Sequence, residues 1–364
     1  MSSLSFIVKC TRRCNLRCSY CHDWRDSGVR ALSFEHLAKL TREAFDHADR
    51  VQFIWHGGEP LLLGREWFEK ALLIQDMAMD EGQAVTNQLQ TNATLLDEEW
   101  VEFFERHNFQ LGVSVDGPPE MHDRTRVDVR GEGTAERVRE GVELLKDSDV
   151  PFGLLMVVTD EVLERDPVEL YEWFKSIGAP SVGFLSQRPD TEGLEAVREP
   201  SEMSAFLGKE RYAEFMCEIF DEWWADDGDG PEVRELAALL KGMVDSDPGM
   251  CIYAGSCVGK YFGVNPNGDV YHCDRYIPDP EYKVGNIGEE DFEFLPDHIL
   301  EIQQREAEKE AAAEESCEWY SVCHGGCPHD RNTNPAGWEA RDSCCGMAPL
   351  LERMDEKVER ALPQ

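Results

Sequence analysis

Short apolar runs alternate with longer amphipathic stretches through the first half of the chain. Runs of five to seven residues predict six strands, at residues 5–9, 51–56, 84–90, 110–115, 152–158 and 181–185. Between them, apolar positions recur every three to four residues and predict helices at residues 34–46, 66–80, 97–107, 134–145 and 166–177. Six strand–helix units in a row predict a parallel sheet, open or curled into a partial barrel, with its working residues at the carboxyl ends of the strands.

This alternation ends near Gln187. Residues 188–202 are a polar stretch with two prolines, and residues 211–224 predict a helix that contains two tryptophans. Residues 226–231 are rich in Gly and Asp and predict a linker. We therefore expect two domains, residues 1–225 and 226–364. A Glu/Ala-rich helix is expected at residues 305–315, as a solvated surface element.

The chain is strongly acidic, with 73 acidic and 36 basic residues and a net charge of −37. Such a surface repels nucleic acid and anionic membranes, so we expect neither as a partner. The N-terminus turns polar within nine residues, and no apolar run reaches the ~18 residues that would span a bilayer. We expect a cytoplasmic protein, whose thirteen cysteines indicate metal or cluster ligation rather than disulfides.

Three cysteines, Cys14, Cys18 and Cys21, follow the first predicted strand. Three thiolates can hold three irons of a [4Fe–4S] cluster and leave the fourth iron open to a small molecule. A zinc site is the alternative, because Cys10 or His22 would supply the fourth ligand that zinc prefers. Spacing alone leaves both interpretations open.

Two further segments stand at the ends of predicted strands. Gly57-Gly58-Glu59-Pro60 follows the second strand, where two glycines let the backbone approach a ligand closely. The carbonyls there and the Glu59 carboxylate are candidate acceptors for an ammonium group. Ser114-Val-Asp116-Gly-Pro ends the fourth strand, and Arg126 lies shortly after it. Read alone, Asp116-Gly-Pro is also an ordinary turn sequence.

Cys-x3-Cys-x-Tyr-Cys one strand before Gly-Gly-Glu-Pro resembles the radical S-adenosylmethionine (SAM) superfamily. The resemblance implies that Cys14, Cys18 and Cys21 bind a [4Fe–4S] cluster. It places Tyr20 near the adenine of SAM and the segment from Gly57 through Gly58 to Glu59 at its amino group. It also implies that Ser114 contacts SAM, that Asp116 lies nearby and that Arg126 binds the SAM carboxylate.

Eight cysteines between residues 251 and 345 resemble the SPASM extension, which carries two auxiliary [4Fe–4S] clusters. The implied fold is a partial (β/α)6 radical SAM barrel with a C-terminal SPASM domain, and three clusters in all. The first auxiliary cluster would use Cys251, Cys257, Cys273 and Cys327. The second would use Cys317, Cys323 and one of Cys344 and Cys345. A zinc ribbon is the alternative, although the long spacings fit it poorly.

The second auxiliary motif departs from the family pattern, because Glu314 stands where the first cysteine of a Cys-x2-Cys pair is expected. Its fourth ligand stays open between Glu314, the Cys344–Cys345 pair and an open iron. Cys10 and Cys217 match no ligand position, and we expect both to be buried. Asp274 directly follows Cys273 and matches the general base of the sulfatase-maturing branch; the alternative is a turn-forming Asp beside Arg275.

By resemblance, the enzyme cleaves SAM to a 5′-deoxyadenosyl radical that abstracts hydrogen from a peptide or protein substrate, with a flavodoxin- or ferredoxin-type reductant. We favour crosslinking of a ribosomally made precursor peptide, because His56 stands where sulfatase maturases carry Gln. No leader-binding domain is expected ahead of Cys14. Oxidation of Cys or Ser to formylglycine in a sulfatase is the alternative. A non-catalytic iron–sulfur or zinc protein is a third hypothesis, although it would need no SAM-binding segment.

Overall fold

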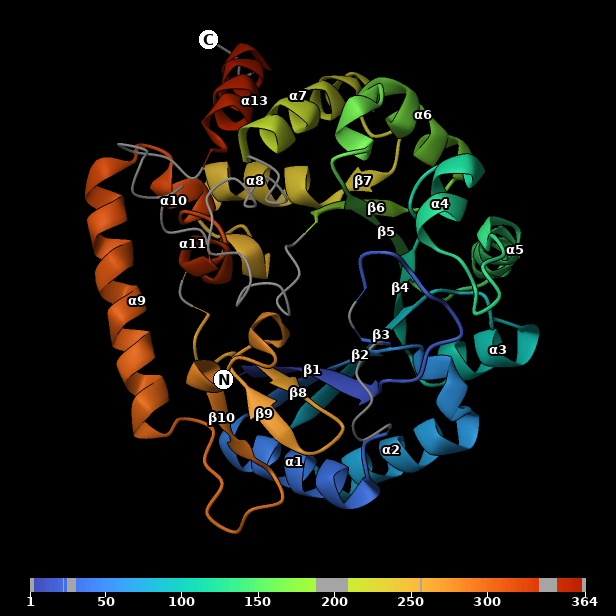
Figure 1. The fold of residues 1–364 in the computed structure, drawn as a ribbon. Helices are drawn as coiled ribbons and strands as arrows, with labels where there is room; N and C mark the ends of the chain where they lie inside the picture. Colours follow the sequence, from blue (N-terminus) through green and yellow to red (C-terminus); the bar gives the residue numbers. More distant parts are fainter. Residues whose placement is uncertain are drawn as a thin grey trace. The chain divides into compact units, whose positions relative to one another are not determined.

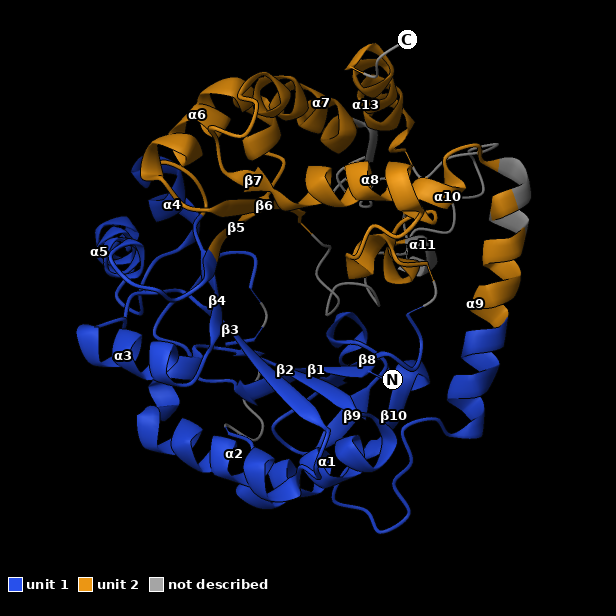
Figure 2. Cartoon of the chain, turned by 180° about the vertical axis from the view of Figure 1, so that it is seen from behind, with its two compact units in different colours: residues 1–115, 119–152, 257–304 blue, residues 116–118, 153–256, 305–364 orange. Residues whose placement is uncertain are grey.

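The structure is a computed structural model that describes residues 3–21, 23–24, 31–187, 209–255, 257–333 and 346–361. The chain forms two compact units, coloured separately in Figure 2. Unit 1 comprises residues 1–115, 119–152 and 257–304, and unit 2 comprises residues 116–118, 153–256 and 305–364. Both units therefore draw on the N-terminal and C-terminal halves of the sequence.

Unit 1 is built on seven strands in the order β10-β9-β8-β1-β2-β3-β4. Strands β8, β1, β2, β3 and β4 are parallel, and β9 and β10 continue the sheet in antiparallel fashion. The bounds are β1 Ser3–Thr11, β2 Arg50–Gly57, β3 Ala84–Thr91, β4 Gln110–Ser114, β8 Tyr261–Val264, β9 Asp269–Tyr271 and β10 Lys283–Asn286.

Helices follow the first strands of unit 1, and α1 and α2 lie side by side along the sheet (Figure 1). Their bounds are α1 Phe34–His47, α2 Arg65–Ala78, α3 Glu98–Arg106, α4 Pro119–Thr125 and α5 Ala135–Lys146. Ser33 caps α1, because its hydroxyl accepts a hydrogen bond from the His36 N–H. Asp97 caps α3 in the same way through the Trp100 N–H.

Unit 2 contains three parallel strands in the order β5-β6-β7. Helix α7 packs against α6 and α13, and α8 packs against α10. The bounds are β5 Phe152–Val158, β6 Ser181–Ser186, β7 Glu232–Val233, α6 Pro167–Ile177, α7 Lys209–Ala225, α8 Arg234–Asp245, α10 Tyr320–Cys323, α11 Pro328–Thr333 and α13 Ala348–Ala361. Helix α9 covers Asp297–Ser316.

All six predicted strands are present, with ends that differ by at most two residues. The helix expected at 305–315 is the second half of the longer α9. Sequence periodicity missed α4 and the short strands β7 to β10, which are too brief to show a period. The polar stretch 188–202 lies outside the described residues. The domain boundary at the 226–231 linker, which lies between α7 and β7, stays a prediction.

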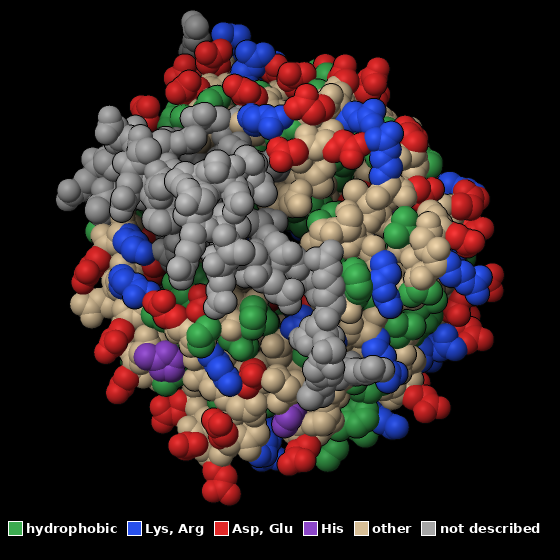
Figure 3. Space-filling model, in the orientation of Figure 1, with side chains coloured by type: hydrophobic (Ala, Val, Ile, Leu, Met, Phe, Trp, Pro, Cys, Tyr) green, Lys and Arg blue, Asp and Glu red, His purple; other side chains and the backbone are tan. Residues whose placement is uncertain are grey.

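The surface of the protein carries many acidic side chains (Figure 3). Acidic side chains are spread over the face drawn in Figure 3 rather than gathered in one patch. In the described part of the chain, no helix is both long and apolar enough to cross a membrane.

The core of unit 1 contains one buried polar cluster beneath β2 and β3. The Trp55 indole N–H donates to Asn87 Oδ1 at 2.8 Å, and Asn87 exchanges two hydrogen bonds with the Gln75 amide at 2.9 and 3.0 Å. All three side chains are buried, so each polar atom depends on its partner. The cluster fixes α2 against the sheet.

Replacing Asn87 with Leu should lower the free energy of unfolding by about 3 kcal/mol, because it leaves the Gln75 amide and the Trp55 N–H buried without partners. Chemical denaturation measures the loss. The matched control is Gln88→Leu, one residue along β3, whose hydrogen bond to Gln110 is exposed. An Asn87 variant as stable as the Gln88 variant would contradict the expectation.

Candidate active site

The three N-terminal cysteines lie on a loop directly after β1. Backbone hydrogen bonds tie this loop to the segment after α4: Arg17 N–H donates to Val127 O at 2.7 Å, and Ser19 N–H donates to Thr125 O at 2.9 Å. A β-bridge joins Leu16 and Asp128. The loop is therefore held by the chain that follows β4.

The thiols of Cys14, Cys18 and Cys21 lie close enough to interact. Burial raises the pKa of Cys14 to about 12; the Leu16 N–H opposes this, while Glu59 and the other two thiols raise it further. Cys14 Sγ accepts hydrogen bonds from Leu16 N at 3.3 Å and from Asn92 Nδ2 at 3.9 Å. Buried thiols with N–H donors suit an iron–sulfur cluster, whose sulfurs accept such bonds.

A single metal ion such as zinc would need at least three ligand side chains close together. Across the described ranges, no group of three or more His, Cys, Asp and Glu side chains could hold one metal ion. His22, one of the candidate zinc ligands, lies outside those ranges. Cys10, the other, is buried as predicted, and its thiol donates to the His56 carbonyl at 3.3 Å.

Gly57 and Gly58 pass directly against the backbone of the cysteine loop. A Cβ added at Gly57 would lie 2.2 Å from Thr11 O, and one at Gly58 would lie 2.0 Å from Arg13 O. The same contact carries hydrogen bonds of 2.7 Å from Gly58 N to Thr11 O and from Glu59 N to Arg13 O. The glycines thus permit β2 to approach β1 closely, a role that the sequence assigned only to a ligand.

The Glu59 carboxylate is fully buried and points into the protein. It accepts hydrogen bonds from Leu61 N at 3.1 Å, Thr91 Oγ1 at 2.8 Å and Asn92 N at 2.8 Å. Burial raises its pKa to about 7, although these three bonds oppose the shift. Glu59 therefore ties the end of β2 to the end of β3.

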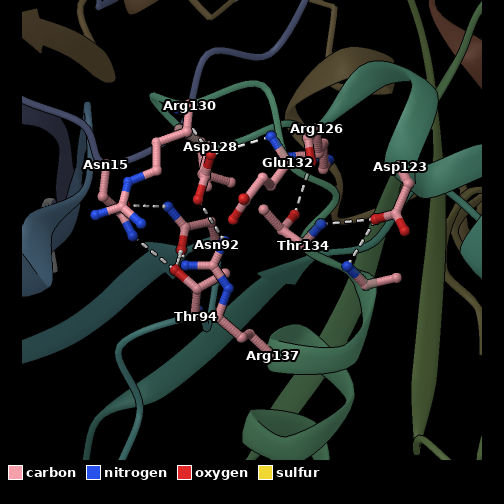
Figure 4. A network of polar contacts seen from close by, with 12 residues as sticks. Asn15, Asn92, Thr94, Asp123, Arg126, Asp128, Arg130, Glu132, Thr134 and Arg137 are labelled. Carbon is pink, nitrogen blue, oxygen red and sulfur yellow. Dashed lines mark hydrogen bonds and ion pairs between the residues drawn. The ribbon is translucent and has the colours of Figure 1, made fainter.

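Three residues to which the sequence assigned no role complete this region. Asn15, Asn92 and Thr94 form a closed set of hydrogen bonds, visible in Figure 4: Asn15 Nδ2 to Thr94 Oγ1 at 2.7 Å, Asn92 Nδ2 to Asn15 Oδ1 at 2.9 Å and Thr94 Oγ1 to Asn92 Oδ1 at 2.7 Å. They join the cysteine loop to the end of β3. In the sequence, the only signal for a role of these three residues was their position near the ends of predicted strands.

The candidate SAM ligands after β4 lie in different surroundings. Ser114 Oγ accepts a hydrogen bond from Gln90 Nε2 at 2.9 Å. Asp116 is buried, and its carboxylate accepts a hydrogen bond from Val157 N at 3.2 Å within unit 2. Arg126 is also buried, with its guanidinium carbon 5.4 Å from the centre of the Tyr20 ring. Tyr20 and Arg126 are thus brought together, and their roles toward SAM stay predictions.

A second set of polar contacts fixes the segment that carries Arg126. Thr134 Oγ1 donates to Arg126 O at 2.7 Å, and Asp123 accepts a hydrogen bond from Thr134 N at 2.7 Å (Figure 4). Asp128 accepts from Arg130 N and Glu132 N and pairs with Arg137 at 3.1 Å. Arg126 is therefore held by its backbone while its side chain faces Tyr20.

Asp274 begins a short 3₁₀ turn, Asp274–Tyr276, directly after Cys273. Its Oδ1 accepts a hydrogen bond from Cys273 Sγ at 3.4 Å, and its Oδ2 lies 3.8 Å from Lys9 Nζ on β1. Lys9 also contacts Asp23 at 3.1 Å and His56 Nδ1 at 3.3 Å. The structure thus brings Asp274 and His56 to one lysine, which the sequence had not singled out.

The four cysteines of the first predicted auxiliary cluster are divided between the units, with Cys257 and Cys273 in unit 1 and Cys251 and Cys327 in unit 2. In unit 1, His272 precedes Cys273, and its Nε2 lies 3.9 Å from Cys257 Sγ. In unit 2, His324 Nδ1 lies 2.6 Å from Tyr253 O, which places the turn that contains Cys251 beside the segment that leads to Cys327.

The second predicted auxiliary cluster is only partly described. Cys317 precedes the turn that leads into α10, whereas Cys323 is the last residue of α10 and is buried. Glu314 is exposed on α9. Cys344 and Cys345 lie outside the described residues, so the fourth ligand stays open. Cys217 is half-buried rather than fully buried, with a pKa raised to about 11 chiefly by burial.

Two family models match the chain. The radical SAM superfamily matches residues 8–174, and the SPASM iron–sulfur cluster-binding domain matches residues 251–328. The serine-type anaerobic sulfatase-maturating enzyme of Bacteroides thetaiotaomicron is 31% identical over 90% of this chain and 82% of its own length. The chain belongs to the radical SAM/SPASM maturase family. Its cofactors are accordingly [4Fe–4S] clusters and SAM.

Other members of the family are similar along almost the whole chain. The cysteine-type anaerobic sulfatase-maturating enzyme of Clostridium perfringens (strain 13) is 30% identical over 92% of this maturase and 91% of its own length. The solved structure of native anSMEcpe with bound AdoMet is 27% identical, with a TM-score of 0.82 over 98% of this maturase and 97% of that chain.

A solved structure that contains a precursor peptide is less similar in sequence. Streptococcus suis SuiB bound to its precursor peptide SuiA is 14% identical, with a TM-score of 0.62 over 94% of this maturase and 74% of that chain. That likeness shows the fold alone. The predicted α/β fold, the radical SAM enzyme class and the cofactors are therefore confirmed, whereas the favoured crosslinking reaction gains no support beyond the fold.

Gly58→Ala should prevent the cysteine loop from holding its place, because the added methyl group overlaps the Arg13 carbonyl. We expect loss of bound iron and a fall of about a hundredfold in 5′-deoxyadenosine formation. The control is Gly82→Ala, which has open space around it and costs only the ~1 kcal/mol of its left-handed backbone. Normal iron content in the Gly58 variant would contradict the expectation.

Glu59 should make the stability of the cluster-free maturase depend on pH. Its folded pKa of about 7 lies above the ordinary value of 4.5, so protonation of Glu59 stabilises the folded state. This stabilisation is complete below pH 4.5 and is lost as the pH rises through 7. Between pH 5 and pH 8, the unfolding free energy of the wild type should fall by about 2 to 3 kcal/mol relative to Glu59→Gln. Denaturation at both pH values measures this; equal slopes would refute it.

Proposed function

We propose that this maturase oxidises a Cys or Ser side chain of a protein substrate to formylglycine, the reaction of anaerobic sulfatase-maturating enzymes. Similarity along nearly the whole chain to both cysteine-type and serine-type enzymes supports the proposal. The structural observation that carries it is the Asp274 carboxylate, which follows Cys273 and is held by Lys9 in a partly buried site. A carboxylate placed in this way is a suitable general base.

The proposal assigns the clusters as follows. Cys14, Cys18 and Cys21 would hold the cluster that binds SAM, because their thiols are buried together among N–H donors. The first auxiliary cluster would be held by Cys251, Cys257, Cys273 and Cys327. Cys317 and Cys323 would contribute to the second. Tyr20 and Arg126 would bind the adenine and the carboxylate of SAM, and Ser114 would lie beside them.

Contacts in the structure revise the expected roles of Gly57, Gly58, Glu59 and Asp116. Gly57 and Gly58 would act by bringing β2 against the cysteine loop, with their carbonyls at the SAM amino group. Glu59 would hold the ends of β2 and β3 in place, because three of its acceptor positions are already used. Asp116 would support the end of β4 through its bond to Val157.

Oxidation of the substrate carbon removes one hydrogen atom, one proton and one electron. SAM supplies the acceptor of the hydrogen atom, and an iron–sulfur cluster supplies the acceptor of the electron. Asp274 would take the proton from the substrate hydroxyl or thiol. The product is an aldehyde directly from Ser; from Cys it is a thioaldehyde, which water converts to the aldehyde with release of hydrogen sulfide.

Crosslinking of a precursor peptide is the second candidate. His56 favours it, because this residue stands where the sulfatase-maturing branch carries Gln, and Glu314 is a further departure from that branch. Hydrogen abstraction would be common to both reactions. They would differ in whether the oxidised carbon becomes an aldehyde or is captured by a second side chain. A flavodoxin- or ferredoxin-type reductant would serve either reaction.

Anaerobically reconstituted maturase should convert peptides with a Cys-x-Pro-x-Arg or Ser-x-Pro-x-Arg motif to aldehydes, in step with 5′-deoxyadenosine. Hydrazide trapping and mass spectrometry measure the product. Changing Cys14, Cys18 and Cys21 to Ala should abolish both products, because the irons lose their ligands. The control is Cys217→Ala, outside every ligand position.

Two outcomes would contradict the proposal. SAM cleavage without any aldehyde from either peptide would remove sulfatase maturation as the reaction. A peptide that loses two hydrogens and gains a new link between residues would establish crosslinking in its place.

A further inference from the structure

Lys9 is the most deeply buried lysine at the candidate site, with 7% of its surface exposed. It lies near the end of β1, directly opposite His56 on β2 in the parallel register. Its ammonium group has three contacts: Asp23 Oδ2 at 3.1 Å, His56 Nδ1 at 3.3 Å and Asp274 Oδ2 at 3.8 Å. A buried ammonium must be paired, so these contacts determine where the side chain lies.

A neighbouring arginine fixes one of the three contacts from the other side. Arg12 is also buried, and its guanidinium donates both to Asp23 and to Asn265, which follows β8. Asp23 thus lies between two cationic side chains, Lys9 and Arg12. Asp23 therefore anchors Lys9 and leaves its other contacts for His56 and Asp274.

The position of Lys9 also determines the form of the His56 ring. His56 Nδ1 accepts a hydrogen bond from Gly57 N at 2.7 Å and faces the Lys9 ammonium, which can only donate. A nitrogen that accepts from two donors carries no proton, so the neutral ring carries its proton on Nε2. Lys9 and the Gly57 N–H thus both face His56 Nδ1, and Lys9 also reaches Asp274.

We propose that Lys9 is a positioning residue that holds Asp274 and His56 for the step after hydrogen abstraction. The inference rests on the proposed function. In that step the substrate radical loses its proton to Asp274 and its electron to an iron–sulfur cluster, which completes the two-electron oxidation. Without Lys9, the carboxylate loses its cationic partner and its place. Hydrogen abstraction continues, while oxidation of the radical fails.

The test is the amount of aldehyde formed per 5′-deoxyadenosine, with a Cys-x-Pro-x-Arg peptide deuterated at the reacting carbon. Lys9→Met should lower this ratio about tenfold, whereas deuterium should still reach 5′-deoxyadenosine, because abstraction does not need Asp274. Lys9→Arg keeps the charge and should recover part of the ratio. The matched control is Lys283→Met, which removes another ion-paired lysine of unit 1 and should leave the ratio unchanged.

A double variant tests whether Lys9 acts through Asp274. Lys9→Met should have no further effect on the ratio in an Asp274→Asn background, because the two residues act as one unit. Additive losses would show that Lys9 acts elsewhere and would overturn the inference. An unchanged ratio in Lys9→Met would overturn it as well.

Loss of the clusters in Lys9→Met is a separate outcome, and a second variant decides what it means. If Lys9→Met binds less iron, Lys9→Ala is tested with added ethylammonium, which can fill the vacated place of the ammonium group. Recovery of the ratio per bound cluster supports positioning, and failure to recover assigns Lys9 to assembly of the site. If the wild type makes no aldehyde, it is the proposed function that fails; if the wild type makes it and Lys9→Met remains coupled, only the inference fails.

Discussion

The candidate active site depends on one buried carboxylate. Glu59 ends β2, yet its hydrogen bonds reach the end of β3 at Thr91 and Asn92. Asn92 then contacts Cys14 and Asn15, so one carboxylate connects two strand ends to the cysteine loop. Burying this group is costly, and only the three donors around it compensate. The geometry of the loop is therefore tied to the presence of all three.

A second set of buried charges organises the region around the end of β1. Lys9 and Arg12 face Asp23, and Lys9 also reaches Asp274 after Cys273. These residues come from the first strand, the cysteine loop and the segment that precedes β10. Close ion pairs of low exposure lose much of their value if one member is removed, since the remaining charge is left without a partner. The network thus makes the placement of Asp274 sensitive to residues far from it in sequence.

The strands, most helices and the positions of the candidate ligands follow from the sequence, because apolar alternation and strand-end motifs are local signals. Lys9 had no such signal. It stands at the polar end of an apolar strand, and its burial depends on Asp23 and Asp274, which only the fold brings to it. Glu59 shows the same limit: its motif indicates proximity to SAM, but the direction of its side chain depends on donors supplied by β3.

The identity of the substrate is governed by what surrounds the radical after it forms. Hydrogen abstraction is common to formylglycine formation and to crosslinking, so the cysteine loop and the SAM ligands do not separate them. Under the proposed function, Asp274 and His56 are the residues that would bear on the choice, and both contact the same lysine. A histidine whose Nδ1 only accepts presents a donor on Nε2, whereas a glutamine at this place would present an amide. The specificity of this maturase is therefore best sought in the pair that Lys9 holds, rather than in the machinery that generates the radical.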